Sequence, residues 1–205
     1  MVKRSELEER AGILIIDDEP HNVEALIEFL ERRGIEVQYT SDLAEGAETI
    51  SEAYKEGRTY SAIVCDNHFP NSGLEKYDPN FNGIDLVSIL SKNSRDLPQD
   101  RGHRQFVKDY FGRDLGGIRR EYRGKIVMFS GSAYSESSEI DSSVEIVQKF
   151  PDTEGVCCES GVLDVLEGLG LDLEGREDSE LLEYKERNDL CYGLPSDDER
   201  ILGFY

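Results

Sequence analysis

A short apolar run ends abruptly on an acidic residue in the stretch YSAIVCDNHFP, residues 60–70. Residues 62–65 are apolar and include β-branched side chains, which predicts a buried strand. The run stops at Asp66, and Pro70 follows shortly afterwards. Open α/β sheets bind ligands outside the carboxyl ends of their strands, so a carboxylate at this point predicts a functional group. The alternative interpretation is that Asp66 only marks the end of the strand and has no functional role.

Two further apolar runs end in the same way. Residues 12–16 are followed by Asp17 and Asp18, and residues 125–129 are followed by Ser130. Because the carboxyl ends of parallel strands meet at one edge of a sheet, these ends predict a cluster of three carboxylates and a hydroxyl. The alternative is that the acidic residues only cap the helices that follow. That alternative does not explain why three strand ends agree.

Predicted strands and helices alternate along the chain, which indicates an α/β domain whose parallel sheet has helices on both faces. Pro20 and Gly34 suit the start and the end of the first helix. A Ser-rich segment leads into a helix that carries Ile140, Val144 and Val147, ahead of a short fifth strand. The expected strands are residues 12–16, 35–40, 60–65, 125–129 and 155–158, and the expected helices lie at about residues 20–34, 41–57, 83–90, 103–111 and 162–169.

Two stretches interrupt this alternation. Residues 71–81 are rich in Asn, Gly, Pro and Ser, and we expect a loop there. Residues 92–124 carry nine basic and five acidic residues, an excess of positive charge that is either an internal counterweight or a docking surface. The C-terminal residues 171–205 carry eleven acidic and four basic residues. We expect this tail to fold back on the basic stretch and to use the aromatic rings of residues 106–111 as anchors.

The composition excludes several classes of protein. The 205 residues include 44 acidic and 23 basic ones, a formal net charge of −21, which argues against nucleic-acid binding. The sequence has no apolar run of about 18 residues, so we expect no membrane span. Residues 1–10 lack the apolar core of a secretory signal. The four cysteines have no zinc-site spacing and are typical of a reduced compartment, so we expect the protein in the cytoplasm.

The stretches ILIIDDEPHNVEALIEFL, AIVCDNHFP, NGIDLVSIL and IVMFSGSA together resemble the receiver domain of two-component response regulators. A weaker similarity extends to GVLDVL. The resemblance covers residues 12–170, apart from the insertions at about 71–81 and 92–124. It implies a flavodoxin-like, doubly wound, five-stranded parallel sheet in a receiver-like domain of residues 1–170. We expect the acidic C-terminal extension, residues 171–205, not to form an effector domain.

By this resemblance Asp66 is the phosphoacceptor, whose carboxylate takes a phosphoryl group as an acyl phosphate. Asp17, Asp18 and Asp66 together bind Mg²⁺, or Mn²⁺, and the backbone carbonyl of His68 is a further ligand. Mg²⁺ suits such a site, because proteins bind it through a few carboxylates and waters. The cation offsets the repulsion among three neighbouring carboxylates.

The resemblance also implies roles for the fourth and fifth strands. Ser130 carries the hydroxyl that follows the phosphoryl group, and Gly131 leaves room for the donor. The family has a lysine after the fifth strand, three residues beyond an aromatic residue. With the fifth strand at residues 155–158, these positions fall on Glu159 and Val156. The chain is therefore expected to be an atypical receiver without the lysine.

Two functions from different classes remain open. The first is a stand-alone receiver in a phosphorelay, a signalling protein and not an enzyme. It accepts a phosphoryl group on Asp66 from a histidine kinase or phosphotransfer protein and acts on an unknown downstream protein through a changed surface. The second is a pseudo-receiver, a protein-interaction module that is independent of phosphorylation.

Two further classes fit the residues less well. A phosphatase of the haloacid-dehalogenase type also uses an aspartate at a strand end, but the second aspartate of that class is replaced here by His68. Dinucleotide binding is disfavoured because the first strand leads into DDEPHN and not into a glycine-rich turn.

Overall fold

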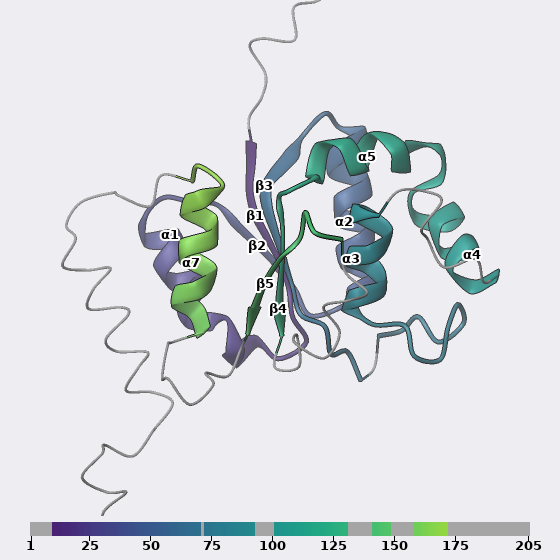
Figure 1. Cartoon of the computed structure of the whole chain (residues 1–205), viewed down its shortest axis with the longest axis horizontal. Coiled ribbons are helices and arrows are strands. Elements are labelled where there is room, and N and C mark those ends of the chain that lie inside the picture. The colour runs from purple at the N-terminus through teal and green to yellow at the C-terminus, as the bar shows by residue number, and fades with distance from the viewer. Residues whose placement is uncertain (1–9, 71, 93–100, 131–140, 149–157, 172–205) are drawn as a thin grey trace, which may run out of the picture.

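The computed structural model describes residues 10–70, 72–92, 101–130, 141–148 and 158–171. Its centre is one five-stranded sheet in which every neighbouring pair of strands is parallel (Figure 1). The spatial order is β2-β1-β3-β4-β5, the order of a flavodoxin-like doubly wound fold. The strands are β1 (Arg10–Ile16), β2 (Val37–Thr40), β3 (Thr59–Cys65), β4 (Ile126–Ser130) and β5 (Glu145–Gln148).

Helices cover both faces of this sheet. Figure 1 shows α1 and α7 on one face, with α2, α3 and α5 on the other and α4 farther out on that second side. The helical elements are η1 (Pro20–Asn22), α1 (Glu24–Arg32), α2 (Leu43–Lys55), α3 (Gly83–Ser91), α4 (Arg101–Tyr110), η2 (Gly112–Asp114), α5 (Leu115–Tyr122) and α7 (Cys158–Gly168). None of the helices within these described residues has the length and apolar composition needed to cross a bilayer.

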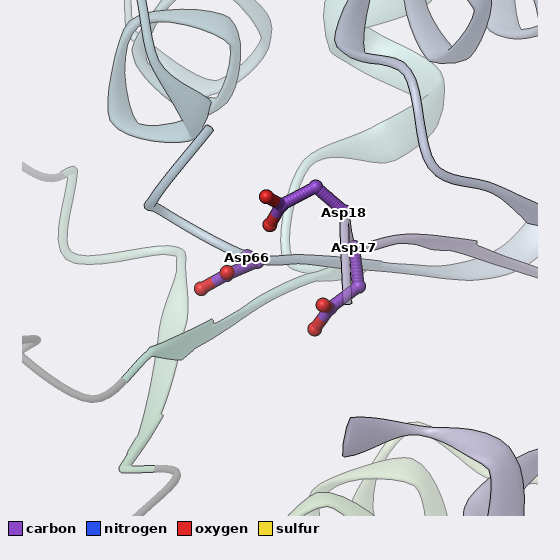
Figure 2. Close-up of side chains that lie close together, drawn as sticks. All are labelled: Asp17, Asp18 and Asp66. Carbon is purple, nitrogen blue, oxygen red and sulfur yellow. The ribbon is translucent and has the colours of Figure 1, made fainter. Parts of the chain in front are cut away.

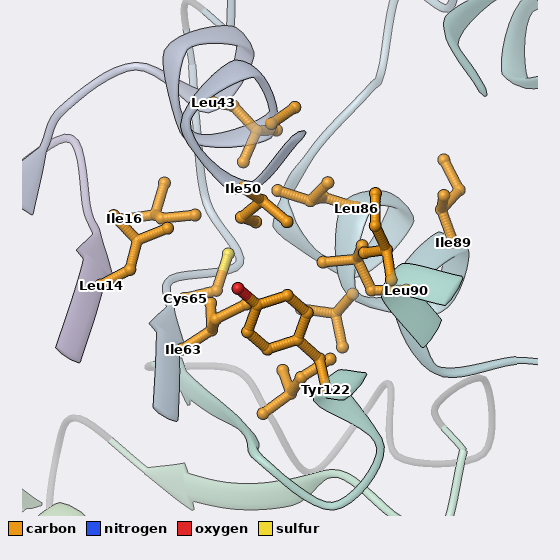
Figure 3. Close-up of a cluster of buried hydrophobic side chains, with 14 of the residues drawn as sticks. Leu14, Ile16, Leu43, Ile50, Ile63, Cys65, Leu86, Ile89, Leu90 and Tyr122 are labelled. Carbon is orange, nitrogen blue, oxygen red and sulfur yellow. The ribbon is translucent and has the colours of Figure 1, made fainter. Parts of the chain in front are cut away.

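The two faces of the sheet carry separate hydrophobic cores. Successive strand side chains point to opposite faces, so in β1 Ile13 and Ile15 pack on the α1 and α7 side. Leu14 and Ile16 pack on the other side, with α2, α3 and α5 (Figure 3). All four of these side chains are fully buried. Burial on both faces explains why the strand is a continuous apolar run and not an alternating one.

The structure confirms the parallel α/β fold and corrects its fifth strand. The predicted helix carrying Val144 and Val147 is wrong, because residues 145–148 form β5, paired with β4. Val144 and Ile146 pack in one core and Val147 packs in the other, which is the two-residue alternation of a strand. Sequence spacing alone resembled a helix, because apolar residues four and three positions apart also fit one helical face.

This correction changes the place of Glu159. Cys158, predicted to end the fifth strand, is instead the first residue of α7. Glu159 therefore lies within α7 and does not directly follow the fifth strand. The residue that follows β5 in the sequence is Lys149, which lies outside the described residues, as does the acidic extension from residue 172 onward.

The two insertions pack against each other. Phe106 in α4 lies 4.6 Å from Phe81 and 5.4 Å from Tyr77, ring centre to ring centre, and Tyr77 donates a hydrogen bond of 2.9 Å to Asp109. Phe106 and Phe111 are buried within the hydrophobic core on the side of α2, α3 and α5. These ring contacts of Phe106 are thus made within the insertions, and the predicted contact with the acidic tail involves residues outside the described part of the chain.

Helix α5 was not predicted, because its sequence contains Gly116 and Gly117, and glycine disfavours helix. The structure supplies the reason for one of them. A Cβ on Gly117 would overlap the hydroxyl of Tyr54 in α2. Glycine there permits the close approach of α5 to α2.

Candidate functional site

The two strands that carry the candidate carboxylates are neighbours at the centre of the sheet. From β1 the chain crosses to β2 on one side, and from β2 it returns past β1 to β3 on the other side. The carboxyl ends of β1 and β3 therefore flank the topological switch point, where doubly wound sheets form a crevice for ligands. The backbone N–H of Asp66 donates to the carbonyl of Ile16 at 2.8 Å, and that of Asp17 donates to Thr40 at 3.1 Å. Each aspartate thus makes one further backbone hydrogen bond to the neighbouring strand, just beyond the end of its own strand.

The structure brings the three predicted carboxylates together. Carboxylate oxygens of Asp17, Asp18 and Asp66, one from each residue, all lie within 4.8 Å of one another (Figure 2). Asp17 is 1 % exposed and Asp66 is 4 % exposed, while Asp18 is half-buried. Such close carboxylates repel one another unless a cation or a proton offsets their charge.

The negative charge of this cluster affects the pKa of a nearby tyrosine. Tyr39 lies in β2 and donates its hydroxyl hydrogen to the backbone carbonyl of Asp17 at 2.7 Å. Burial raises the pKa of Tyr39, and the charges of Asp17 and Asp18 raise it further, because a phenolate beside them would be repelled.

The donor set of this cluster fits a hard divalent cation. All three groups are carboxylates, and Mg²⁺ is typically bound through one or two carboxylates together with waters or phosphate oxygens. Mn²⁺ accepts the same oxygen ligands. Within the described residues, this trio is the group of acidic, His or Cys side chains with the geometry to hold a metal ion.

The loop after β1 contains several hydrogen bonds between residues close in sequence. The backbone N–H of Glu19 donates to Asp17 Oδ1 at 3.0 Å, and the side-chain amide of Asn22 donates to Glu19 at 2.8 Å. Pro20 occupies the first turn of η1, where its missing N–H is not needed. These contacts fix the acidic pair at the start of a helical turn.

The loop after β3 is held differently, by the first turn of α3. The backbone N–H of Asn67 donates to Asp66 Oδ1 at 2.6 Å. Its carbonyl accepts from Gly83 N–H at 2.9 Å, and its side-chain oxygen accepts from Ile84 N–H at 3.2 Å. A Cβ on Gly83 would overlap the carbonyl oxygen of Asp66, so this position requires glycine. Sequence analysis missed Asn67, because a polar residue after a strand has no local signature of a partner 17 residues away.

The remaining predicted site residues are placed in part. Ser130 is the last residue of β4 and is in register with Gln148 of β5, so it lies at the same edge of the sheet as the aspartates. His68 lies two residues after Asp66, with an exposed side chain. Gly131 lies outside the described residues. Glu159 lies in α7.

The end of β5 shifts the two positions that the sequence had placed at Glu159 and Val156. Counting from the observed strand end at Gln148, the next residue is Lys149, and the residue three positions earlier is Ile146. Ile146 is half-buried against the core under α2, α3 and α5. The residue that directly follows the observed fifth strand is thus a lysine, and the residue three positions before it is aliphatic.

No family model and no curated protein matches the sequence. Solved structures do match it. A response regulator receiver protein from Sinorhizobium medicae WSM419 is 18 % identical, with 81 % of this chain and 98 % of that chain covered and a TM-score of 0.45. A response regulator receiver domain protein from Clostridium thermocellum is 16 % identical, with coverage of 78 % and 93 % and a TM-score of 0.44. The bacteriophytochrome response regulator RtBRR is 16 % identical, with coverage of 89 % and 90 % and a TM-score of 0.47.

Two of these proteins are named as response regulator receivers and the third as a response regulator. The likeness concerns the fold, and it is the strand order of this chain itself that identifies the flavodoxin-like sheet.

Proposed function

We propose that this chain is a receiver that accepts a phosphoryl group on Asp66 and binds Mg²⁺ through Asp17, Asp18 and Asp66. The observation that supports this function is the convergence of these carboxylates, within 4.8 Å of one another, at the switch point of a flavodoxin-like sheet. The donor is the phosphohistidine of a histidine kinase or of a phosphotransfer protein. The result is a changed surface for a downstream protein.

In the transfer, a carboxylate oxygen of Asp66 attacks the phosphorus of the donor. The new bond is the P–O bond of an acyl phosphate, the bond that breaks is the P–N bond of phosphohistidine, and the leaving imidazole takes up a proton. When bound, Mg²⁺ would offset the negative charge on the oxygens of the transferring group. Asp17 and Asp18 would hold the cation, with the backbone carbonyl of His68 as a further ligand. The hydroxyl of Ser130 would bind the phosphoryl group, and Gly131 would leave room for the donor.

We further propose that Lys149 supplies the positive charge that was expected to be missing. It follows β5 directly in the sequence, as the family's lysine follows its fifth strand. Lys149→Ala is expected to slow labelling of Asp66 by about a hundredfold, the typical loss for one charge-stabilising group. Glu159→Lys is the matched control, and it should leave the labelling rate unaltered. If the Glu159→Lys variant were labelled faster and Lys149→Ala had no effect, the position of the family's lysine would be residue 159 and not residue 149.

The central experiment is mass spectrometry of the intact chain after treatment with acetyl phosphate and Mg²⁺. One phosphoryl group is expected on the wild-type protein and none on Asp66→Asn. Asp164→Asn, an exposed position on α7, is the control and should label as the wild type does. A wild-type chain that stays unlabelled contradicts phosphoryl acceptance.

Metal binding has its own readout. Millimolar Mg²⁺ is expected to raise the melting temperature, because a ligand that binds only the folded state stabilises it. Asp18→Ala should remove this rise. An unchanged melting temperature of the wild-type chain contradicts the metal site.

One observation favours a second function, that of a pseudo-receiver which binds a partner without phosphorylation. Ile146 stands where the family has the aromatic residue that changes rotamer with the phosphorylated state. An aliphatic side chain there cannot make that change. Mg²⁺ binding without any labelling of Asp66 would support this second function.

A further inference from the structure

The residue after the candidate acceptor contacts both the acceptor and a helix. Asn67 is 5 % exposed. Its N–H donates to Asp66 Oδ1 at 2.6 Å, while its carbonyl and side-chain oxygens accept from the N–H groups of Gly83 and Ile84. The backbone and the side chain of this one buried residue therefore link the acceptor carboxylate to the start of α3.

The two N–H groups that Asn67 accepts belong to the first turn of α3. The first four N–H groups of a helix have no partner within the helix. Here a capping box satisfies one of them, since the side chain of Asn82 accepts from Asp85 N–H at 3.3 Å and Asp85 accepts from Asn82 N–H at 2.9 Å. Asn67 satisfies two others, at the first two positions of the helix. The cap of α3 is thus shared between a residue beside the helix and a residue from the acceptor loop.

The chemistry of the side chain at position 67 suits this place. The contact with Ile84 N–H needs an acceptor oxygen of the right reach, which asparagine supplies without charge. An aspartate would add a fourth carboxylate beside Asp17, Asp18 and Asp66. An alanine would leave the buried N–H of Ile84 without this partner.

We infer that Asn67 is a positioning residue for phosphoryl acceptance, an inference that depends on the proposed function. Its N–H holds one oxygen of the Asp66 carboxylate, and its carbonyl and side chain fasten the loop to α3. Because Gly83 meets the Asp66 carbonyl without room for a Cβ, the loop packs directly against the start of the helix. The carboxylate is thereby fixed in rotation, and the backbone that leads to the His68 carbonyl is fixed in direction.

The test compares Asn67→Ala with the wild type in the rate of labelling by acetyl phosphate at saturating Mg²⁺, expressed per folded molecule. Asn67→Ala is expected to label about ten to a hundred times more slowly, the scale of loss for a misplaced reacting group. Asn67→Asp restores the acceptor oxygen and is expected to recover most of the rate, because saturating cation offsets the added charge. Asn80→Ala, at an exposed position, is the control and should label at the wild-type rate.

A second readout separates positioning from stability. The melting temperature without metal reports the structural cost of Asn67→Ala, and the additional rise with Mg²⁺ reports the geometry of the site. We expect the variant to lose most of the Mg²⁺-dependent rise. A wild-type rate per folded molecule, together with a wild-type Mg²⁺ response, would overturn the positioning role.

The failure of this inference differs from the failure of the proposed function. If the wild-type chain itself takes up no phosphoryl group, phosphoryl acceptance is wrong, whatever the variant does. If the wild type labels and Asn67→Ala labels equally fast, only the role of Asn67 is wrong.

Discussion

On one face of the sheet, α1 and α7 meet the strands through side chains such as Leu26, Leu30, Val162 and Leu166. On the other face, the core of α2, α3 and α5 is extended by the rings that the two insertions contribute, among them Phe106. The first face is the plain βα packing that the sequence periodicity predicts. The second face has an additional layer, joined to the domain by aromatic contacts between segments far apart in sequence.

The additional layer also reaches the candidate site. His103 of α4 is buried, stacks on Phe81 and lies 2.9 Å from Asp85 through its Nε2 atom. Asp85 belongs to the capping box at the start of α3, the same turn that holds Asn67. The acceptor loop is therefore tied to the insertion side, whereas the loop with Asp17 and Asp18 combines its own short-range contacts with hydrogen bonds to Tyr39 and Thr40 of β2. The two halves of one site thus have different supports.

The largest expected effect breaks the contact between the insertions. Phe106→Ala removes a fully buried ring and should lower the free energy of unfolding by about 3–5 kcal/mol, measured by urea denaturation. Native-state hydrogen exchange should accelerate in α4 and change less in α1. Lys108→Ala, exposed on the same helix, is the control and should stay within about 0.5 kcal/mol of the wild type. Equal acceleration in α1 and α4 would mean that the two faces unfold as one unit.

The next effect tests how closely the acceptor loop depends on α3. Gly83→Ala introduces a Cβ that overlaps the Asp66 carbonyl, and it should cost about 1–3 kcal/mol, the usual range for overpacking. It should also weaken the Mg²⁺-dependent rise in melting temperature. Gly168→Ala is the matched control, because a Cβ there meets open space. A stable Gly83→Ala variant with normal metal binding would show that the loop and the helix are not coupled.

A smaller effect concerns the hydrogen bond between Tyr122 of α5 and Tyr60 of β3. The hydroxyl of Tyr122 accepts a hydrogen bond from Tyr60 N–H at 3.2 Å, so Tyr122→Phe should cost about 1 kcal/mol. Burial raises the pKa of Tyr122 to about 12, above its ordinary value. The neutral form is therefore favoured in the folded state, and its contribution to stability is complete below pH 10 and is lost as the pH rises toward 12.

The measurement for Tyr122 is the urea midpoint as a function of pH. The loss of stability between pH 10 and 12 should be shallower in Tyr122→Phe than in the wild type. It should not vanish, because burial also raises the pKa of Tyr77 to about 12. An identical pH dependence in both proteins would contradict the assignment to Tyr122.

The smallest effect separates the two glycines of α5. Gly116→Ala should raise the free energy of unfolding by about 0.5–1 kcal/mol, since alanine favours helix and a Cβ at this position meets no neighbour. Gly117→Ala should lower it, because its Cβ would overlap Tyr54. The sign of the two changes, measured by thermal unfolding, is the test, and a gain in both would mean that α5 and α2 can separate at little cost.

Much of the sheet could be predicted from the sequence, because its strands are indicated by short runs of neighbouring residues. Strands β1, β3 and β4 each contain a contiguous apolar run, and each run is followed directly by the polar residue that the prediction named. The convergence of Asp17, Asp18 and Asp66 was predictable as well, because parallel strands place their carboxyl ends at one edge whatever the details of packing.

Strand β5 and helix α5 could not be predicted because their signals are not local. In β5 the apolar spacing fits either a helix or a strand, and pairing with β4 decided between them. In α5 the two glycines argue against a helix, and only the approach of Tyr54 explains one of them. The residue that directly follows the fifth strand changed with β5, from Glu159 to Lys149.

The sequence by itself determined strands β1, β3 and β4 and the aspartates that meet at the edge of the sheet. Only the tertiary structure decided how those residues are held. The hydrogen bonds from Gly83 and Ile84 to Asn67 span residues far apart in the chain, and the packing of Phe106 against Phe81 and Tyr77 does the same. Such contacts form only after the sheet has brought distant segments together, so no local pattern of residues encodes them.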